Sequence, residues 1–313
     1  MAAAGDAADR PASGAPRGRA VRAPHPAGPL VAGPRMSDGA SRAEFLRLPS
    51  LDISRPHPAR MYNYWLGGKD NFQADRDAAE YLLTVVPDGL AVARANRDFA
   101  LRATRYMAAH GIRQFLDLGS GLPARPAVHE IAQHYQRAAH VVYVDSDPIV
   151  ASHNHALSGQ VAGVGSVQAD IRDPQAMLAH SALTALIDPR QPTGLLCIAV
   201  MHFVEADDPA AIISSLRAQL APGSVLALSH ITSDGTRPEV AAEIRETYRE
   251  ASAPAVFRTE AEISAIFGSA LVPPGLVPVS SWRPSLAPGR RPTGKRLPTN
   301  KMLRVVGGVA HFT

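Results

Sequence analysis

Two short stretches of this chain carry residues whose types and spacing suit the binding of an adenosine-bearing ligand. In the first, the apolar residues 114–118 run into an Asp-x-Gly-x-Gly turn made by Asp117, Gly119, Ser120 and Gly121. Glycine in such a turn lets the backbone approach a ligand closely and adopts positive φ at little cost. The second apolar run ends in Asp145, whose carboxylate can accept hydrogen bonds from a ribose diol. The pair predicts a nucleoside cofactor at the edge of a parallel sheet.

The segments that must position these residues alternate between strand-like and helix-like patterns after residue 110, as in a doubly wound sheet. Predicted strands cover residues 114–118, 140–145, 164–169, 194–200, 225–229, 276–280 and 303–309. Predicted helices cover residues 75–84, 90–110, 128–135, 148–157, 174–186, 209–220, 238–251 and 260–267. We therefore expect an α/β fold: a Rossmann-like, doubly wound, mostly parallel seven-stranded sheet with an N-terminal helical extension.

A third carboxylate, Asp170, directly follows the third predicted strand, as Asp117 and Asp145 close the first and second. Open α/β sheets bind ligands at the carboxyl ends of their strands, so we expect all three to lie at one edge. Each Asp taken alone is equally well explained as a helix N-cap. Their succession along one edge favours a ligand site.

The composition fits a buried globular core, with 46% hydrophobic residues in 313. Cys197 is the single cysteine and lies in an apolar run, so no internal disulfide can form and a reducing cytoplasm is expected. No apolar run approaches the roughly 20 residues that span a bilayer, and no spacing resembles a metal cluster. We expect a protein without membrane attachment or metal.

Charge is distributed unevenly along the chain. Residues 1–42 carry six Arg against three Asp, residues 283–304 carry seven Lys or Arg and no acid, and residues 43–282 carry 19 basic against 25 acidic side chains. An acidic body argues against a nucleic-acid interface, which would need clustered basic residues, and favours a small-molecule partner. The basic segment at 283–304 is either a solvated loop or a contact for an anionic partner. The sequence does not indicate an oligomeric state.

The chain divides at about residue 42. Residues 1–42 are rich in Ala, Gly, Pro and Arg without apolar periodicity, which predicts a disordered tail, and Met36 is an alternative translation start to Met1. Residues 43–313 form the predicted domain, with residues 43–110 as a helical lid and 111–313 as the α/β core. Within the lid, residues 62–72 mix aromatic, glycine and polar side chains, which suits a loop that wraps a ligand or an aromatic-anchored turn.

Several of these motifs together resemble class I S-adenosylmethionine-dependent methyltransferases. The chain is most similar to a bacterial family first catalogued as a domain of unknown function and later named S-adenosyl methyltransferase. The resemblance rests on residues 58–72, 96–99, 117–123, 128–130, 142–148, 200–204 and 220–224, and it covers roughly residues 45–311. One departure is Ala127, where the family leads us to expect Asn. The resemblance implies a methyltransferase that uses S-adenosylmethionine on an acceptor that the sequence does not identify.

The resemblance also implies a set of cofactor contacts. Asp117 and the backbone of Gly119, Ser120 and Gly121 would lie beside the methionine part, and Asp145 with Ser146 would bind the ribose, where Asp147 could help. Asp170 would meet the adenine amino group, with Ile171 against the ring. Tyr62 and Lys69 would form a cover together with Tyr64, Trp65 and Asn71, and Lys69 or Arg60 would meet a carboxylate.

Two histidines are expected at the same edge, His202 after the fourth strand and His230 after the fifth. A neutral imidazole is a suitable general base near pH 7 for an acceptor that carries a proton. Each histidine could instead simply pack and bond to loop backbone. Alignment of donor and acceptor can supply much of the rate of methyl transfer without any base.

Two alternative functions remain open from the sequence. Gly119 to Ala124 formally satisfies G-x-G-x-x-A, which would suit an NAD(P)-dependent oxidoreductase. Against this, Asp117 would bring negative charge to a pyrophosphate, and a dinucleotide fingerprint normally opens its domain. The second alternative is a non-catalytic ligand-binding protein on a methyltransferase fold.

Overall fold

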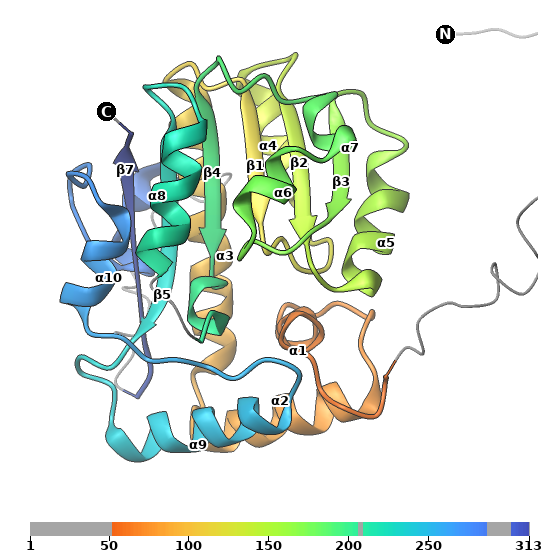
Figure 1. Ribbon diagram of the computed structural model, residues 1–313. Coiled ribbons are helices and arrows are strands. Elements are labelled where there is room, and N and C mark those ends of the chain that lie inside the picture. Colours follow the sequence, from red (N-terminus) through yellow and green to blue (C-terminus); the bar gives the residue numbers. More distant parts are fainter. Residues whose placement is uncertain (1–51, 206–208, 287–301, 313) are drawn as a thin grey trace, which may run out of the picture. The chain divides into compact units, whose positions relative to one another are not determined.

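The computed structural model describes residues 52–205, 209–286 and 302–312. A seven-stranded sheet with the order β3-β2-β1-β4-β5-β7-β6 forms its centre (Figure 1). The strands are β1 Gln114–Leu118, β2 His140–Asp145, β3 Val164–Gln168, β4 Thr193–Ile198, β5 Val225–Thr232, β6 Val277–Pro278 and β7 Arg304–His311. The helices are α1 Pro58–Trp65, α2 Gln73–Val85, α3 Gly89–Ala109, α4 Val128–Tyr135, α5 Pro148–Ser158, α6 Pro174–Leu178, α7 Ser181–Thr184, α8 Pro209–Gln219, α9 Pro238–Glu250 and α10 Glu260–Phe267.

The first five strands are parallel, with β1 between β2 and β4, so their carboxyl ends meet at one edge. The chain order reverses at β1, because β2 and β3 continue the sheet on one side and β4 and β5 on the other. Such a reversal leaves a crevice at the carboxyl ends of the central strands, where ligands bind in open α/β sheets. β7 runs antiparallel between β5 and β6. The expected Rossmann-like, mostly parallel sheet is confirmed.

Both faces of the sheet are covered by apolar side chains, as expected for buried parallel strands. Successive residues of β1 serve opposite faces: Phe115 packs in the cluster that includes α3, α4 and α9, while Leu116 and Leu118 pack in the cluster that includes α6, α8 and α10. This burial fixes the register of β1 and therefore where Asp117 and the following turn emerge.

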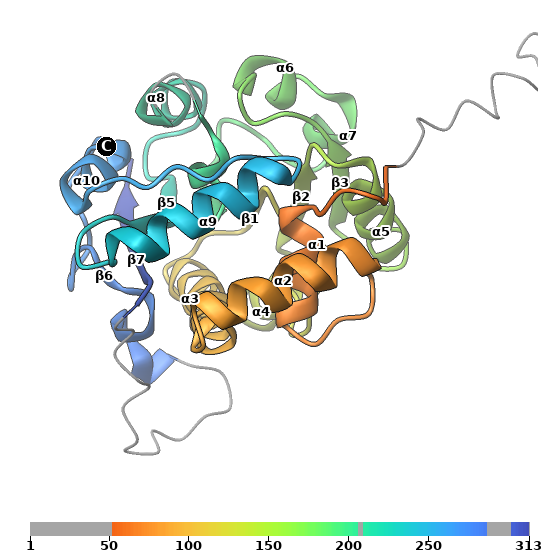
Figure 2. The ribbon, with the colours of Figure 1, turned by 90° about the horizontal axis from the view of Figure 1, so that it is seen from below.

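Helices α1, α2 and α9 lie at the carboxyl edge of the sheet, at the bottom of Figure 1 and in front in Figure 2. α2 and α9 contact each other, and the hydroxyl of Tyr81 in α2 donates to Glu243 in α9 at 2.6 Å. The longer α3 packs against α4 and the sheet instead. The N-terminal helices therefore serve both as part of a face layer and as part of a cover over the strand ends. None of the described helices is long and apolar enough to cross a membrane.

Three differences from the sequence prediction go beyond shifts of one or two residues at the end of an element. The strand expected at 225–229 continues to Thr232, because its pairing with β7 extends through His230 opposite Val306. The helix expected at 174–186 is two short helices, because His180 takes an extended backbone and caps the second. Part of the loop expected at 62–72 is helical, since Tyr62 to Trp65 close α1 after a helix start at Pro58. The predicted tail, residues 1–42, lies outside the described residues.

Candidate functional site

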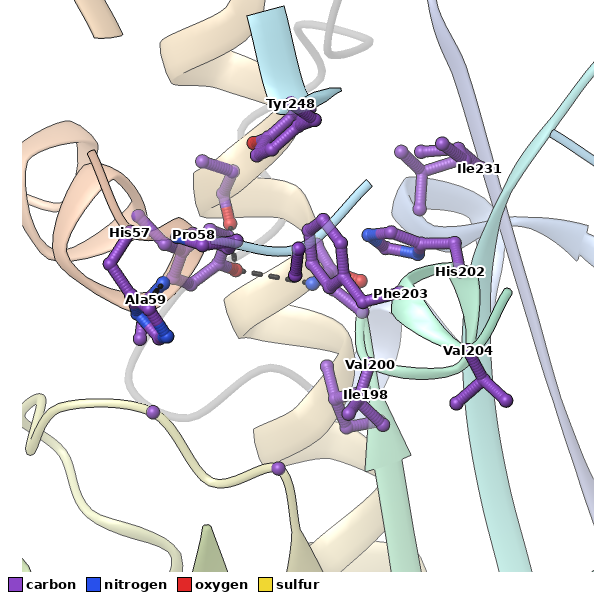
Figure 3. A pocket seen from close by; sticks show the side chains of 18 of the residues that line it. His57, Pro58, Ala59, Ile198, Val200, His202, Phe203, Val204, Ile231 and Tyr248 are labelled. Carbon is purple, nitrogen blue, oxygen red and sulfur yellow. Dashed lines mark hydrogen bonds between the residues drawn. The ribbon is translucent and has the colours of Figure 1, made fainter. Parts of the chain in front are cut away.

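The carboxyl ends of the parallel strands open onto one cavity of about 520 Å³. Four predicted site residues line it from successive strand ends: Asp117 in β1, Asp145 at the end of β2, Asp170 after β3 and His202 after β4. In Figure 3, His57, Pro58 and Ala59 lie on one side of the cavity, and His202 and Ile231 lie on the other. The cavity therefore spans both halves of the sheet edge, on either side of β1.

The glycine turn after β1 is shaped for close approach. Gly119 and Gly121 have φ values of 65° and 64°, in the left-handed region that favours glycine. A Cβ on Gly119 would lie 2.2 Å from a methyl carbon of Val200, so the turn packs directly against the segment after β4. A Cβ on Gly121 would meet no protein atom within 4 Å, so its absence leaves space along the cavity.

Asp145 is held rigidly beside this turn. One carboxylate oxygen accepts from the backbone N–H of Gly121 at 2.9 Å, and the other accepts from the backbone N–H of Asp147 at 3.0 Å. Burial raises the pKa of Asp145, and these backbone donors oppose that rise. Because each carboxylate oxygen has two lone pairs, each keeps one for a ligand hydroxyl.

Asp117 has no described hydrogen bond to its side chain, although only 6% of the residue is exposed. Burial raises the pKa of its carboxyl to about 7, and the positive charge of Arg97 partly offsets this. Arg97 itself is committed to the backbone carbonyls of Ala124 and Pro126. A buried carboxyl without a partner at a cavity wall is suited to pair with a cationic ligand group.

Asp170 and Ile171 also line the cavity, but Asp170 already has a partner. Its carboxylate accepts from Nε of the exposed Arg172 at 2.9 Å. These hydrogen bonds lower the pKa of Asp170. A ligand amino group would therefore share this carboxylate with Arg172 at a partly solvated site. Ser146, in the loop after β2, lines the cavity and is exposed.

The aromatic cover predicted from residues 62–72 is only partly present. Tyr62 lines the cavity, and its hydroxyl donates to the carbonyl of Ala93 at 2.9 Å and accepts from Asn96 at 3.1 Å. Trp65 also lines the cavity, whereas Tyr64 reaches outward to Glu80.

Lys69 is exposed and is not part of the cavity lining, so its expected role in the cover is corrected. The loop that carries it is fastened to α1 instead, because Asn71 donates to Asn63 at 2.9 Å and to the carbonyl of Gly68 at 3.1 Å. Arg60 likewise pairs with the buried Asp75 at 2.9 Å and is not part of the cavity lining. The glycine- and asparagine-rich string thus shapes the turn after α1.

His202 reaches the cavity from the short 3-10 helix η1, Met201–Phe203. No described hydrogen bond reaches its ring, and Nδ1 is buried without a partner. Burial, together with the neighbouring His230 and Arg258, holds the pKa of His202 well below its usual range. The imidazole is therefore neutral near pH 7 and has a lone pair available.

His230 is placed differently from the prediction and does not line the cavity. Because β5 continues to Thr232, His230 lies inside the strand and is fully buried. Its Nδ1 donates to the carbonyl of Ile231 at 2.6 Å, and its Nε2 accepts from Arg258 at 2.9 Å. Neither ring nitrogen is free for an acceptor, which corrects the expected role of His230 as a base.

Asp147 also departs from its expected role at the ribose. It caps α5 by accepting from the backbone N–H groups of Ile149 and Val150, at 2.7 and 3.1 Å. Its second oxygen pairs with Nε2 of His57 at 3.1 Å, which ties the start of α1 to the start of α5. His57 lines the cavity.

Sequence reasoning missed Tyr248, which lines the cavity from α9 and is 8% exposed. Its ring lies 5.2 Å from that of Phe203, and its hydroxyl has no hydrogen-bond partner in the part of the chain that the structure describes. The spacing of Val240, Ile244 and Tyr248 indicates a buried helix face but not what that face meets. Asn96 lies in the motif at residues 96–99 that supports the family resemblance, but we predicted no role for it. Its side chain accepts from Ser229 at 2.6 Å and donates to Tyr62.

Among the described residues there is no group of three or more His, Cys, Asp or Glu side chains that could hold a metal ion. The three carboxylates Asp117, Asp145 and Asp170 come from the ends of three separate strands.

A family model described as S-adenosyl methyltransferase matches residues 46–313. A solved structure from Thermobifida fusca, which carries a provisional methyltransferase name, is 35% identical, covers 86% of this chain and 99% of its own, and superposes with a TM-score of 0.76. A DUF574 family protein from Streptomyces avermitilis is 36% identical, covers 84% of this chain and 99% of its own, and gives a TM-score of 0.75. No curated protein sequence matches this chain.

Proposed function

The chain belongs to the S-adenosyl methyltransferase family, and from that premise we propose where its cofactor and acceptor bind. It is an S-adenosylmethionine-dependent methyltransferase, and the family match gives no support to an oxidoreductase or a non-catalytic binding protein. S-adenosylmethionine lies along the ends of β1, β2 and β3, and a small-molecule acceptor lies towards β4 and β5. The observation that carries this proposal is a single cavity that runs from Asp145 to His202.

The cavity residues at the ends of β1, β2 and β3 fit this cofactor in three ways. Asp117 offers a buried carboxyl without a partner to an ammonium group, and the open space beside Gly121 admits the ligand against the backbone. Asp145 keeps free lone pairs for two ribose hydroxyls. Ser146, Asp170 and Ile171 would surround the adenine side, with Tyr62 above them from α1.

When bound, S-adenosylmethionine supplies an electrophilic methyl group on a positively charged sulfur. The residues of this chain have three tasks around it: they hold the two reactants in line, exclude water and accept one proton. An acceptor with an O–H or N–H group loses one proton for each methyl group that it gains. The neutral ring of His202 supports a role in taking that proton. For an O–H acceptor the low pKa of His202 suffices, since the oxonium formed by methylation is far more acidic than an imidazolium.

The acceptor is proposed to be a small molecule. The acidic balance of residues 43–282, with 19 basic against 25 acidic side chains, disfavours a nucleic acid as the acceptor. A reducing, cytoplasmic location is consistent with Cys197, which is buried in β4 and has a pKa that burial raises.

Calorimetry with three ligands tests the assignment of the cavity. S-adenosylmethionine and its demethylated product are expected to bind with a stoichiometry of one, while NAD gives no heat, because a pyrophosphate beside Asp117 would be repelled. The Asp145→Asn variant is expected to bind both S-adenosylmethionine and its demethylated product at least about ten-fold more weakly. Asp77→Asn, at an exposed position in α2, is the control and should bind them as the wild type does. Binding of NAD but not of S-adenosylmethionine would refute the proposal.

A further inference from the structure

The far end of the cavity is apolar and is built from five separate elements. Its lining there comes from α2, β5, α9 and β7 together with η1, and the residues are Leu82, Phe203, Ile231, Ile244, Tyr248 and Val305. All six belong to, or pack against, one hydrophobic cluster of the described residues. This end lies on the side of β5 and β7, whereas Asp145 ends β2 on the other side of β1.

Charged side chains are concentrated at the other end. Asp117 lies in β1, Asp145 ends β2 and Asp170 follows β3. Of the described residues that line the far end, only Glu205 carries a charge, and it is exposed to solvent. A charged acceptor would lose its hydration in this space without gaining an ionic partner, which is unfavourable.

Two polar groups face this apolar space without partners among the described residues. One is the ring of His202, which in its neutral form has one N–H donor and one lone pair that can accept a proton or a hydrogen bond. The other is the hydroxyl of Tyr248, which can donate. Their rings are linked through Phe203, whose centroid lies 4.4 Å from that of His202 and 5.2 Å from that of Tyr248 (Figure 3).

By contrast, the hydroxyl of Tyr62 is already satisfied. It donates to Ala93 and accepts from Asn96, and Asn96 in turn accepts from Ser229. The chain of bonds continues to the backbone N–H of Ala199, which donates to Ser229 at 3.0 Å. Tyr62 is thus a fixed part of the cavity wall, which leaves Tyr248 as the tyrosine available to a ligand.

We infer that the methyl acceptor is an uncharged, largely apolar small molecule with one O–H or N–H group, held between Phe203 and the α2–α9 cover. The hydroxyl of Tyr248 donates a hydrogen bond to the acceptor atom, and His202 receives the proton of that atom. This inference rests on the proposed function, because it concerns the acceptor end of the same cavity.

The test is calorimetry on the full-length protein saturated with S-adenosylhomocysteine, with naphthol and its carboxylated analogue hydroxynaphthoate as probes. Naphthol is expected to bind, and hydroxynaphthoate is expected to bind at least about ten-fold more weakly because its carboxylate finds no partner. The inference is overturned if the carboxylate binds as tightly as naphthol, or if naphthol does not bind at about 1 mM.

The Tyr248→Phe variant tests the hydrogen bond. It keeps the ring and is expected to weaken naphthol binding by about three- to ten-fold, with the affinity for S-adenosylhomocysteine unchanged. Tyr81→Phe is the matched control, because Tyr81 also contacts α9 but through an exposed hydroxyl outside the cavity. A loss of S-adenosylhomocysteine affinity in Tyr248→Phe would place the hydroxyl at the cofactor and overturn the inference. Failure of the wild-type protein to bind S-adenosylhomocysteine would instead count against the proposed function.

Discussion

The carboxyl of Asp117 combines two properties that are costly together: it is buried, and no described hydrogen bond stabilises its charge. A pKa raised to about 7 means that a substantial part of the free protein carries this group protonated at neutral pH. A cationic ligand beside it would favour the ionised form. Cofactor binding and proton release should therefore be linked at this residue.

The affinity for S-adenosylmethionine is accordingly expected to fall about ten-fold between pH 7 and pH 5.5. The sign follows from the raised pKa: below it, Asp117 is neutral in the free protein and must lose its proton to pair with the cation. The ammonium of the ligand stays charged across this window, since α-amino groups titrate near about 7.7–8.0. Calorimetry over the pH series would measure the slope.

The variant Asp117→Asn removes the titrating group, so its weaker binding should show no such slope, whereas Asp77→Asn should keep the slope of the wild type. An affinity that is flat from pH 7 to pH 5.5 in the wild-type protein would contradict a cation beside Asp117.

At the scale of elements, α1 is tied to both of its neighbours at its first turn. The backbone N–H of His57 donates to Asp75 in α2 at 2.8 Å, and its side chain accepts from the N–H of Ala59 through Nδ1. The proton is therefore on Nε2, which donates to Asp147 at the start of α5. Because Pro58 and Tyr62 line the cavity, this tie holds α1 over the proposed cofactor end.

Removing the pair between His57 and Asp147 should speed the dissociation of the cofactor product. His57→Ala removes the pair with Asp147 and the cap of α1, so S-adenosylhomocysteine is expected to dissociate several-fold faster, with the free energy of unfolding lowered by about 1 kcal/mol. Stopped-flow displacement measures the rate. His155→Ala, at an exposed position in α5, is the control. Unchanged dissociation from His57→Ala would show that α1 does not hold the ligand.

The boundaries of the helices and strands explain why some sequence predictions succeeded. β1, β2 and α10 begin and end as predicted, because apolar runs and turn residues determine them locally. The end of β5 could not be predicted, since its last residues are strand because they pair with β7, more than 70 residues away in the chain. Because of this tertiary pairing, His230 lies inside the buried strand β5 and not at the expected edge of the sheet.

For the whole molecule, the cofactor end of the site was more predictable than the acceptor end. Asp117, Gly119, Gly121 and Asp145 belong to local motifs whose strand-end position follows from the alternating pattern. The acceptor end is assembled from α2, β5, α9 and β7, and only the folded chain shows that they meet. Tyr248 lies in a helix whose pattern is that of any buried face, so no local signal distinguishes it.

The central claim is that one cavity holds the cofactor at Asp145 and presents its sulfur to His202. A crystal structure with S-adenosylhomocysteine tests this most directly. The account predicts both ribose hydroxyls within about 2.7–3.2 Å of the Asp145 carboxylate, the amino group beside Asp117, and the sulfur facing the space between His202 and Tyr248. A ribose bound away from Asp145, or a sulfur that faces Asp170, would contradict it.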